Sequence, residues 1–338
     1  MLALAGVLAL AGVLALAGVL AGTGLAQAQA PRTPGKVNVG YEALATYTPL
    51  FLMAEKGFLK EQGLEATFIR FAGGGRMMLP LSNGDLDVGG DQPSPALANA
   101  IAAGTGAKIV AGKGRMPLEA GKGTSALVIR GDLADQIKTP ADLKGRTMLL
   151  IAPGSPHLFF LGLFFRRYGF TEDDVQYKYM RFPNMPLALH NKQADAAYIV
   201  EPYGMKAVEL GAKLMARAGD VAPGHVVGLT MYSGPFRKQP AAQKFMNAYV
   251  QATRYFTRPE HREENAALLS KWSSVPKELI LKLDFVTVEP NGELNMKSID
   301  EQLAWFYKKR LITMPLTAAD AVDARFVEEA NRQLGPPR

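Results

Sequence analysis

The chain has 338 residues, of which 48% are hydrophobic and 20% are charged, a balance typical of one large globular domain or two ordinary ones. Its net charge is +7, but the tightest basic groups, Arg166-Arg167 and Lys308-Lys309-Arg310, fall in expected helices, which indicates a solvated basic face. Zinc-finger, basic-zipper and RNA-binding signatures are absent, so we expect no nucleic-acid partner. The absence of cysteine excludes disulfides, thiolate metal sites and cysteine nucleophiles.

The N-terminal segment is apolar, repeats LALAGV three times and has no charged residue before Arg32. Ala26-Gln27-Ala28 fits a signal-peptidase site, so we expect residues 1–28 to be a signal peptide and the mature chain to begin at Gln29. The alternative is an uncleaved anchor, because the run exceeds the roughly 20 residues that span a bilayer. Both readings place the remainder outside the cytoplasmic membrane, and we expect a periplasmic protein.

Residues 36–120 alternate between strand and helix patterns. The expected strands are Lys36–Tyr41, Ala66–Phe71, Leu86–Gly89 and Lys108–Gly112, and the expected helices are Thr48–Met53, Met77–Leu81 and Pro93–Ala103. This order is typical of a parallel sheet with crossover helices. It predicts the first part of one α/β lobe.

Residues 121–225 repeat the alternation and predict a second α/β lobe. The expected strands are Thr124–Arg130, Thr147–Ile151, Gln176–Met180, Ala196–Val200 and Lys213–Ala216. Between them we expect a helix capped by Thr139, an aromatic-rich helix ending at Tyr168, a helix over Met185–Asn191 and a helix beginning at Glu201-Pro202-Tyr203.

The last part of the chain, 226–335, begins with a strand, VVGLTMY, and continues mainly as helices. The expected helices cover 239–257, 260–273, 276–283, 297–310 and 317–333. We expect this part to complete the first lobe, so that the chain crosses between the lobes twice. The predicted fold is therefore α/β and two-lobed, with a helical C-terminal portion and an interlobe cleft that can close like a hinge.

A glycine turn, Gly73-Gly74-Gly75, follows the second expected strand. It is no phosphate loop of the Walker type, because Arg76 and Met77 follow, and Met78 stands where a dinucleotide fingerprint needs glycine. A glycine turn at a helix start directs free N–H groups outward and favours an anionic or electron-rich group. The alternative is a tight turn without a ligand.

Other catalytic and metal-binding patterns are weak. The four histidines, His157, His190, His225 and His261, lack paired metal spacing, so we expect no metal site and no cofactor. There is no G-x-S-x-G elbow. Ser155 lies too close in the chain to His157 for an ordinary catalytic triad, which favours a serine that lines a cleft.

Four segments in this order resemble a known family, the solute-binding proteins of the taurine, sulfonate and nitrate class that serve ABC importers. They are AEKGFLKEQGLEATFI at 54–69, NGDLDVG at 83–89, TPADLKG at 139–145 and QADAAYIVEPYGMKA at 193–207. The resemblance runs from about residue 36 to residue 310. It implies a type II periplasmic-binding fold, a ligand in the interlobe cleft and a membrane permease as partner; we also expect a monomer.

The resemblance further implies which positions line the cleft. They are Tyr47, Thr48, Gly74, Gly75, Asp91, Gln92 and Pro93 in the first lobe, Ser155, His157, Glu201 and Tyr203 in the second, and Tyr232 after the returning strand. Turn or core packing is the alternative at each position, and Glu201 could instead shape the hinge. Asp91 departs from a simple anion site because a carboxylate repels an anion, which favours an aminated or partly aromatic ligand.

The expected function is that of an extracytoplasmic solute-binding component of an ABC importer. It would capture a small organic ligand, such as a sulfonate, a carboxylate or a related nitrogen-containing compound, and deliver it to the permease. A membrane-tethered sensor with the same fold is the first alternative. Desulfinases, porphobilinogen deaminases and pyrimidine synthases share the architecture but depend on cysteines that this chain lacks, so we expect no enzyme.

Overall fold

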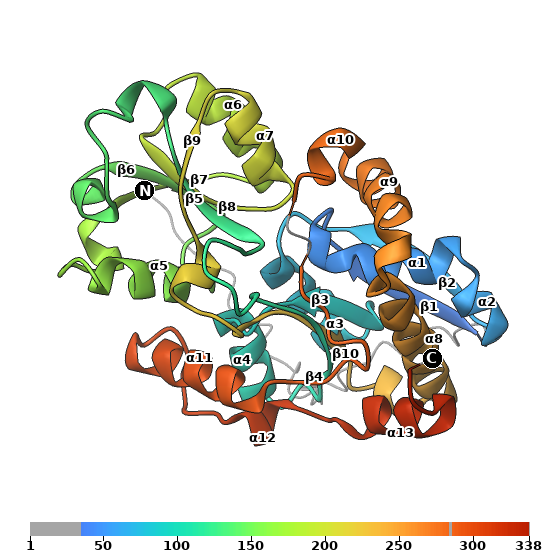
Figure 1. The fold of residues 1–338 in the computed structure, drawn as a ribbon. Helices are drawn as coiled ribbons and strands as arrows, with labels where there is room; N and C mark the ends of the chain where they lie inside the picture. The colour runs from blue at the N-terminus through green and yellow to red at the C-terminus, as the bar shows by residue number, and fades with distance from the viewer. Residues whose placement is uncertain (1–34, 284–285, 338) are drawn as a thin grey trace, which may run out of the picture. The chain divides into compact units, whose positions relative to one another are not determined.

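The computed structural model describes residues 35–283 and 286–337, which belong to the compact unit Gly35–Arg338. This unit contains two five-stranded sheets, each with helices packed around it (Figure 1). The expected signal peptide, 1–28, lies outside the described residues. Within the described ranges, no helix combines the length and apolar character needed to cross a membrane.

The first sheet has the strand order β2-β1-β3-β10-β4. Its strands are β1 (Lys36–Tyr41), β2 (Glu65–Arg70), β3 (Val88–Asp91), β4 (Lys108–Arg115) and β10 (Val226–Tyr232). β1 is parallel to β2 and β3, whereas β10 is antiparallel to its neighbours β3 and β4. β3 is fully buried, and its Gly90 leaves room for the ring of Tyr47, which a Cβ atom would approach to 2.7 Å.

The second sheet has the strand order β7-β6-β8-β5-β9. Its strands are β5 (Ser125–Ile129), β6 (Thr147–Leu150), β7 (Gln176–Tyr179), β8 (Ala196–Val200) and β9 (Lys213–Arg217). β6 is parallel to β7 and β8, and β5 is antiparallel to β8 and β9. Every residue of β5 and β8 is buried, which explains why both strands read as continuous apolar runs.

The four strands of residues 36–120 run in one direction, as expected, whereas β5 and β10 run antiparallel to the strands beside them. β5 and β10 are the strands by which the chain enters the second sheet and returns to the first. A parallel pair needs a crossover, usually a helix, between its strands. β5 and β10 follow interlobe crossings instead, so they run against the strands beside them. The two sheets confirm the predicted α/β class.

Helices cover the sheets and form most of the C-terminal part (Figure 1). They are α1 (Thr48–Glu55), α2 (Phe58–Glu61), α3 (Met78–Asn83), α4 (Pro95–Ala102), α5 (His157–Arg166), α6 (Met185–His190), α7 (Tyr203–Glu209), α8 (Pro240–Phe256), α9 (Arg262–Ser273), α10 (Lys277–Ile280), α11 (Met296–Lys308), α12 (Ala318–Ala321) and α13 (Arg325–Leu334). Local chemistry sets several starts. At α4, for example, the Ser94 hydroxyl accepts a hydrogen bond from the Leu97 N–H at 3.2 Å, and Pro95 takes the first helical position.

The expected single helix over 317–333 is wrong, because α12 and α13 are separate. Between them Val322 is extended and forms a bridge with Ile109 of β4. The Asp323 N–H donates to the Ile109 carbonyl at 2.8 Å, and the Asp323 carboxylate accepts a hydrogen bond from Arg237 Nε at 3.0 Å. These contacts with the edge of the first sheet replace the helical hydrogen bonds that the local pattern favoured.

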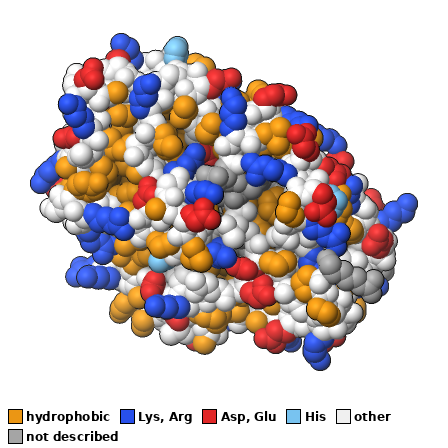
Figure 2. Space-filling view, viewed as in Figure 1, with side chains coloured by type: hydrophobic (Ala, Val, Ile, Leu, Met, Phe, Trp, Pro, Cys, Tyr) orange, Lys and Arg blue, Asp and Glu red, His pale blue; other side chains and the backbone are white. Residues whose placement is uncertain are grey.

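Charged side chains of both signs are interspersed on the face shown in Figure 2. One member of the basic group at the end of α11, Lys309, forms ion pairs with Glu172 and Asp173, the latter at 2.8 Å. These pairs connect α11 with the second lobe. The basic group is therefore partly neutralised within the molecule.

Candidate ligand-binding cleft

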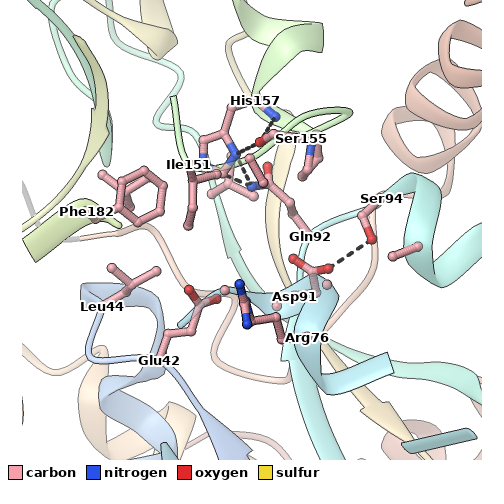
Figure 3. A pocket seen from close by; sticks show the side chains of 18 of the residues that line it. Glu42, Leu44, Arg76, Asp91, Gln92, Ser94, Ile151, Ser155, His157 and Phe182 are labelled. Atoms are coloured by element: carbon pink, nitrogen blue, oxygen red, sulfur yellow. Dashed lines mark hydrogen bonds between the residues drawn. The ribbon is translucent and has the colours of Figure 1, made fainter. Parts of the chain in front are cut away.

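A cavity of about 250 Å³ lies between the two sheets, at the carboxyl ends of their parallel strands. On the first-lobe side it is lined from the segments that follow β1, β2 and β3, and on the second-lobe side from those that follow β6 and β7. Figure 3 shows Glu42, Arg76 and Asp91 on the former side and Ile151, Ser155 and His157 on the latter. Open α/β sheets usually bind ligands at this edge.

The structure brings together many of the side chains expected in the cleft. The cavity is lined by Tyr47, Gly74, Gly75, Asp91, Gln92, Ser155 and His157. Tyr203 lines an adjoining chamber instead. Thr48, Pro93, Glu201 and Tyr232 are not among the residues lining either space.

Two of the residues outside the cavity have packing contacts that occupy their polar groups. The Thr48 hydroxyl is buried and donates to the Ala45 carbonyl at 2.9 Å, at the start of α1. The Tyr232 hydroxyl donates to the Ala242 carbonyl at 2.9 Å, and its ring lies in an aromatic cluster. The rings of that cluster are Phe236, Phe245 and Phe326.

Glu201 lies in the interior of the second lobe. Its carboxylate accepts a hydrogen bond from Arg217 Nη1 at 2.8 Å and another from the Met205 N–H at 2.9 Å, in the first turn of α7. Burial raises the pKa of the Glu201 carboxyl, and Arg217 opposes that rise. The Glu201 carbonyl also accepts a hydrogen bond from the Ala45 N–H of the first lobe at 3.3 Å. The Glu201 side chain is thus used within the second lobe, and its backbone carbonyl contacts the first lobe.

The floor of the cavity holds a buried cluster of titratable groups, Glu42, Tyr47, Asp91 and Lys113. Lys113 Nζ lies 3.4 Å from the centroid of the Tyr47 ring and 3.2 Å from the Thr46 hydroxyl. The Tyr47 hydroxyl donates to the Gly90 carbonyl. The Asp91 carboxylate accepts a hydrogen bond from the Ser94 hydroxyl at 2.9 Å.

Burial moves the protonation equilibria of this cluster towards neutral forms. Desolvation, followed by repulsion from Asp91, raises the pKa of Glu42 to about 8, although Lys113 opposes the rise. Desolvation likewise raises the pKa of Asp91 to about 6 and lowers the pKa of Lys113 to about 7. Burial thus favours the neutral forms of Glu42 and Lys113, and the floor offers both hydrogen-bond donors and acceptors.

The glycine turn packs against this floor. A Cβ atom on Gly74 would lie 2.3 Å from Asp91 Cγ, so glycine is required there by the protein's own carboxylate. A hydrogen bond from the Gly74 N–H to Glu42 helps to lower the pKa of that carboxyl. Gly73 adopts a φ of 138°, which side chains rarely allow. The N–H that the sequence assigned to a ligand is thus engaged by Glu42 in this structure.

The two lobes touch across the cavity through Gln92 and His157 (Figure 3). Gln92 Nε2 lies 3.1 Å from His157 Nδ1, and the Ser155 hydroxyl lies 3.0 Å from the same ring nitrogen. Burial lowers the pKa of His157 to about 3, so its ring is neutral at physiological pH. The ring packs beside Phe182 and Tyr198, which hold it against the second lobe.

A comparison with models of protein families identifies the family of this sequence. The family model described as the NMT1-like family matches residues 30–270, which is well over half of the chain. The chain belongs to the NMT1-like family. A comparison with curated proteins finds no match.

Solved structures share the fold of this NMT1-like protein. The alkanesulfonate-binding protein SsuA from Xanthomonas axonopodis pv. citri, bound to MOPS, has a TM-score of 0.70 and 22% identity over 87% of this chain and 100% of that one. The periplasmic nitrate-binding protein NrtA from Synechocystis PCC 6803 has a TM-score of 0.74 and 15% identity over 89% of each chain. The desulfurization enzyme DszB has a TM-score of 0.62 and 16% identity over 89% of this chain and 99% of that one. These similarities confirm the predicted periplasmic-binding-protein fold and the resemblance to sulfonate- and nitrate-binding proteins.

Sequence reasoning missed two charged residues in the floor of the NMT1-like cleft. Glu42 follows β1 directly, as Asp91 ends β3, so a carboxylate at a strand end was the available signal. Lys113 gave no such signal because it lies inside β4, and its partners come from segments far away in the chain. Arg76 and Arg181 line the cavity as exposed side chains and carry no recognisable motif.

Proposed function

We propose that this protein is the extracytoplasmic solute-binding component of an ABC importer. It binds a small organic ligand between its two lobes and presents that ligand to a membrane permease. The observation that carries the proposal is the cavity itself, a space of about 250 Å³ whose walls come from both sheets and whose buried polar groups face inward. A space of this kind suits the capture of a small molecule by both lobes together.

The solved structures with this fold support the proposal. The Xanthomonas and Synechocystis proteins are named as alkanesulfonate-binding and nitrate-binding proteins, and the first holds MOPS. We infer a periplasmic location and a permease as partner from the same comparison. We expect the protein to act as a monomer and without nucleic acid.

The proposed ligand contacts come from both lobes. On the first lobe they are Tyr47, the glycine turn, Asp91 and Gln92, and on the second they are Ser155 and His157. Apolar side chains such as Leu44 and Phe182 complete the wall. This mixture suits a small organic compound with an apolar body and hydrogen-bonding groups, such as a sulfonate, a carboxylate or a related nitrogen-containing compound.

An enzymatic role has less support. The similar fold of a desulfurization enzyme shows that this architecture can carry catalysis. The desulfinases and deaminases that the sequence resembles in architecture use cysteine, and this chain has none. We therefore propose that the cleft binds and releases its ligand unchanged.

Thermal unfolding with a ligand panel tests the proposal. The panel contains nitrate, ethanesulfonate, MOPS, benzoate, 4-aminobenzenesulfonate and cytosine. A ligand at 100 times its dissociation constant adds about 2.7 kcal/mol to the free energy of unfolding and raises the midpoint. Gln92→Leu should remove the shift, because it breaks the contact with His157, whereas Gln136→Leu, on an exposed position away from the cavity, should keep it. A panel without any stabilising compound would count against a solute-binding role.

A further inference from the structure

A second chamber, of about 420 Å³, adjoins the cavity described above. We call the cavity of about 250 Å³ the inner chamber and this one the outer chamber. They share lining residues, among them Glu42, Leu44, Arg181 and Phe182, so the cleft is one space with two parts. A ligand that enters the inner chamber can therefore extend into the outer one.

The outer chamber gathers hydrogen-bond donors from both lobes. Arg70 is the last residue of β2, and Arg181 follows β7 in the second lobe. Asn184 and Tyr203 line the same chamber. The Tyr203 side chain is buried, and its hydroxyl lies close enough to Arg70 for a hydrogen bond that opposes the rise of its pKa.

Some of the described arginines form ion pairs, whereas Arg70 and Arg181, like Arg76 and Arg167, do not. Arg115, Arg130 and Arg237, for example, each form an ion pair with a carboxylate. Across residues 35–283 and 286–337, neither Arg70 nor Arg181 has such a partner within 4.0 Å. Both side chains are exposed, and they line one chamber from opposite lobes, so two guanidinium groups are available there to an external anion.

Glu42 is the carboxylate among the residues that line the outer chamber, and it does not cancel this positive charge. Its pKa is raised to about 8 by burial, so it is mostly protonated at neutral pH. Burial also raises the pKa of the Tyr203 phenol, and the nearby Arg70 opposes that rise. The outer chamber is thus electropositive, whereas the inner floor has the acidic Asp91.

We propose that the outer chamber is an anion subsite and that the ligand is a two-ended molecule. Its carboxylate, sulfonate or phosphate group is bound by Arg70 and Arg181. Its uncharged end, which carries a hydrogen-bond donor, enters the inner chamber beside Asp91 and Gln92. This inference rests on the proposed solute-binding function and specifies the ligand class. It moves the anion away from the glycine turn, whose Gly74 N–H is engaged by Glu42.

Matched ligand pairs separate charge from shape. 4-Aminobenzenesulfonate and 4-aminobenzenesulfonamide have similar shapes and the same amino group, but the first alone is anionic, and 4-aminobenzoate and 4-aminobenzamide form a second pair. Isothermal titration calorimetry should give the anionic member of at least one pair an affinity at least tenfold higher. Arg70→Gln and Arg181→Gln should each lower the affinity for the anionic member by roughly tenfold or more, because charge-assisted hydrogen bonds are lost. The affinity for the neutral member should change by less than about twofold.

Two further arginine variants locate the subsite. Arg167→Gln, at an exposed position after α5 and outside both chambers, is the matched control and should keep the preference for the anion. Arg76 lines the inner chamber beside the glycine turn. If Arg76→Gln removes the preference and the outer-chamber variants keep it, the anion binds at the turn and the proposal is wrong.

The remaining outcomes also decide the question. Equal affinity for the anionic and neutral members, or binding of neither pair, would overturn the anion subsite. If another compound of the ligand panel still stabilises the protein, the solute-binding function stands and only the subsite fails. If no compound of the panel or of the pairs binds, both proposals fail together.

Discussion

Replacing Gly74 by alanine would place a methyl group against the Asp91 carboxyl. The added Cβ would lie 2.3 Å from Asp91 Cγ and Oδ1 and 2.8 Å from Asp91 Cβ, far inside the normal carbon contact distance of about 3.5 Å. Asp91 has little freedom to move away, because it is buried and held by the Ser94 hydroxyl. The substitution therefore requires a shift of the turn, of β3 or of both.

The expected cost follows from the size of this overlap. Overpacking by one methyl group in a well-packed site costs about 1–3 kcal/mol. For domains of 150–250 residues, each kcal/mol lowers the unfolding midpoint by about 2–4 °C. We therefore expect Gly74→Ala to unfold at a temperature roughly 2–12 °C lower than the parent protein. Valine at the same position should cost more, because it adds two further methyl groups to the overlap.

Differential scanning calorimetry measures this effect, and the neighbouring glycine is the control. A Cβ atom on Gly75 would approach Ala96 no closer than 3.7 Å, an ordinary contact, so Gly75→Ala should leave the midpoint nearly unchanged. Adding Asp91→Ala to Gly74→Ala removes the two shortest contacts and should restore part of the loss. If Gly74→Ala is as stable as Gly75→Ala, packing against Asp91 is not what requires glycine in this turn.

Three further predictions concern pH, a buried ion pair and lobe closure. The pKa of Glu42 is raised from 4.5 to about 8, so the free energy of unfolding should be highest below pH 4.5 and should fall as the pH rises through 8. Urea unfolding at several pH values should show that Glu42→Gln flattens this fall. Parallel pH dependences of the parent and the variant would contradict the prediction. Arg217→Met should lower the free energy of unfolding by roughly 3–5 kcal/mol because Glu201 stays buried without its partner. Lys206→Met, which removes an exposed ion pair with Glu209, should change the free energy of unfolding by less than about 1 kcal/mol. Equal effects of the two substitutions would show that the burial of Glu201 does not set the cost. In small-angle scattering, a bound ligand should reduce the radius of gyration, and an unchanged value at saturation would exclude hinge closure.

The strands were the part of the fold most accessible from the sequence. Lys36–Tyr41 and Val226–Tyr232 have the bounds that their alternating or apolar patterns predicted. Both are short hydrophobic runs that end in turns, so local pattern and tertiary structure agree. Strand direction was less accessible, because it depends on which sheet the chain enters rather than on the residues of the strand.

The features that the sequence did not predict share one physical cause, which is contact between segments far apart in the chain. The break between α12 and α13 comes from pairing of Val322 with Ile109, more than 200 residues earlier. The cavity floor combines Glu42, Asp91 and Lys113, which approach one another only in the folded sheet. Conversely, Ser155 and His157 were accessible because a turn between a strand end and a helix start marks a cleft position in an α/β protein.

The position of β10 between β3 and β4 has a consequence for the order in which the chain can assemble. β10 separates β3 from β4, yet it is made from residues 226–232, after the whole second sheet. The second sheet is continuous in the chain, from β5 to β9, and can form all its pairings as soon as residue 217 is available. A chain that ends before residue 226 therefore holds a first sheet without β10. Until β10 arrives, the facing edges of β3 and β4 are open to pairing with another chain.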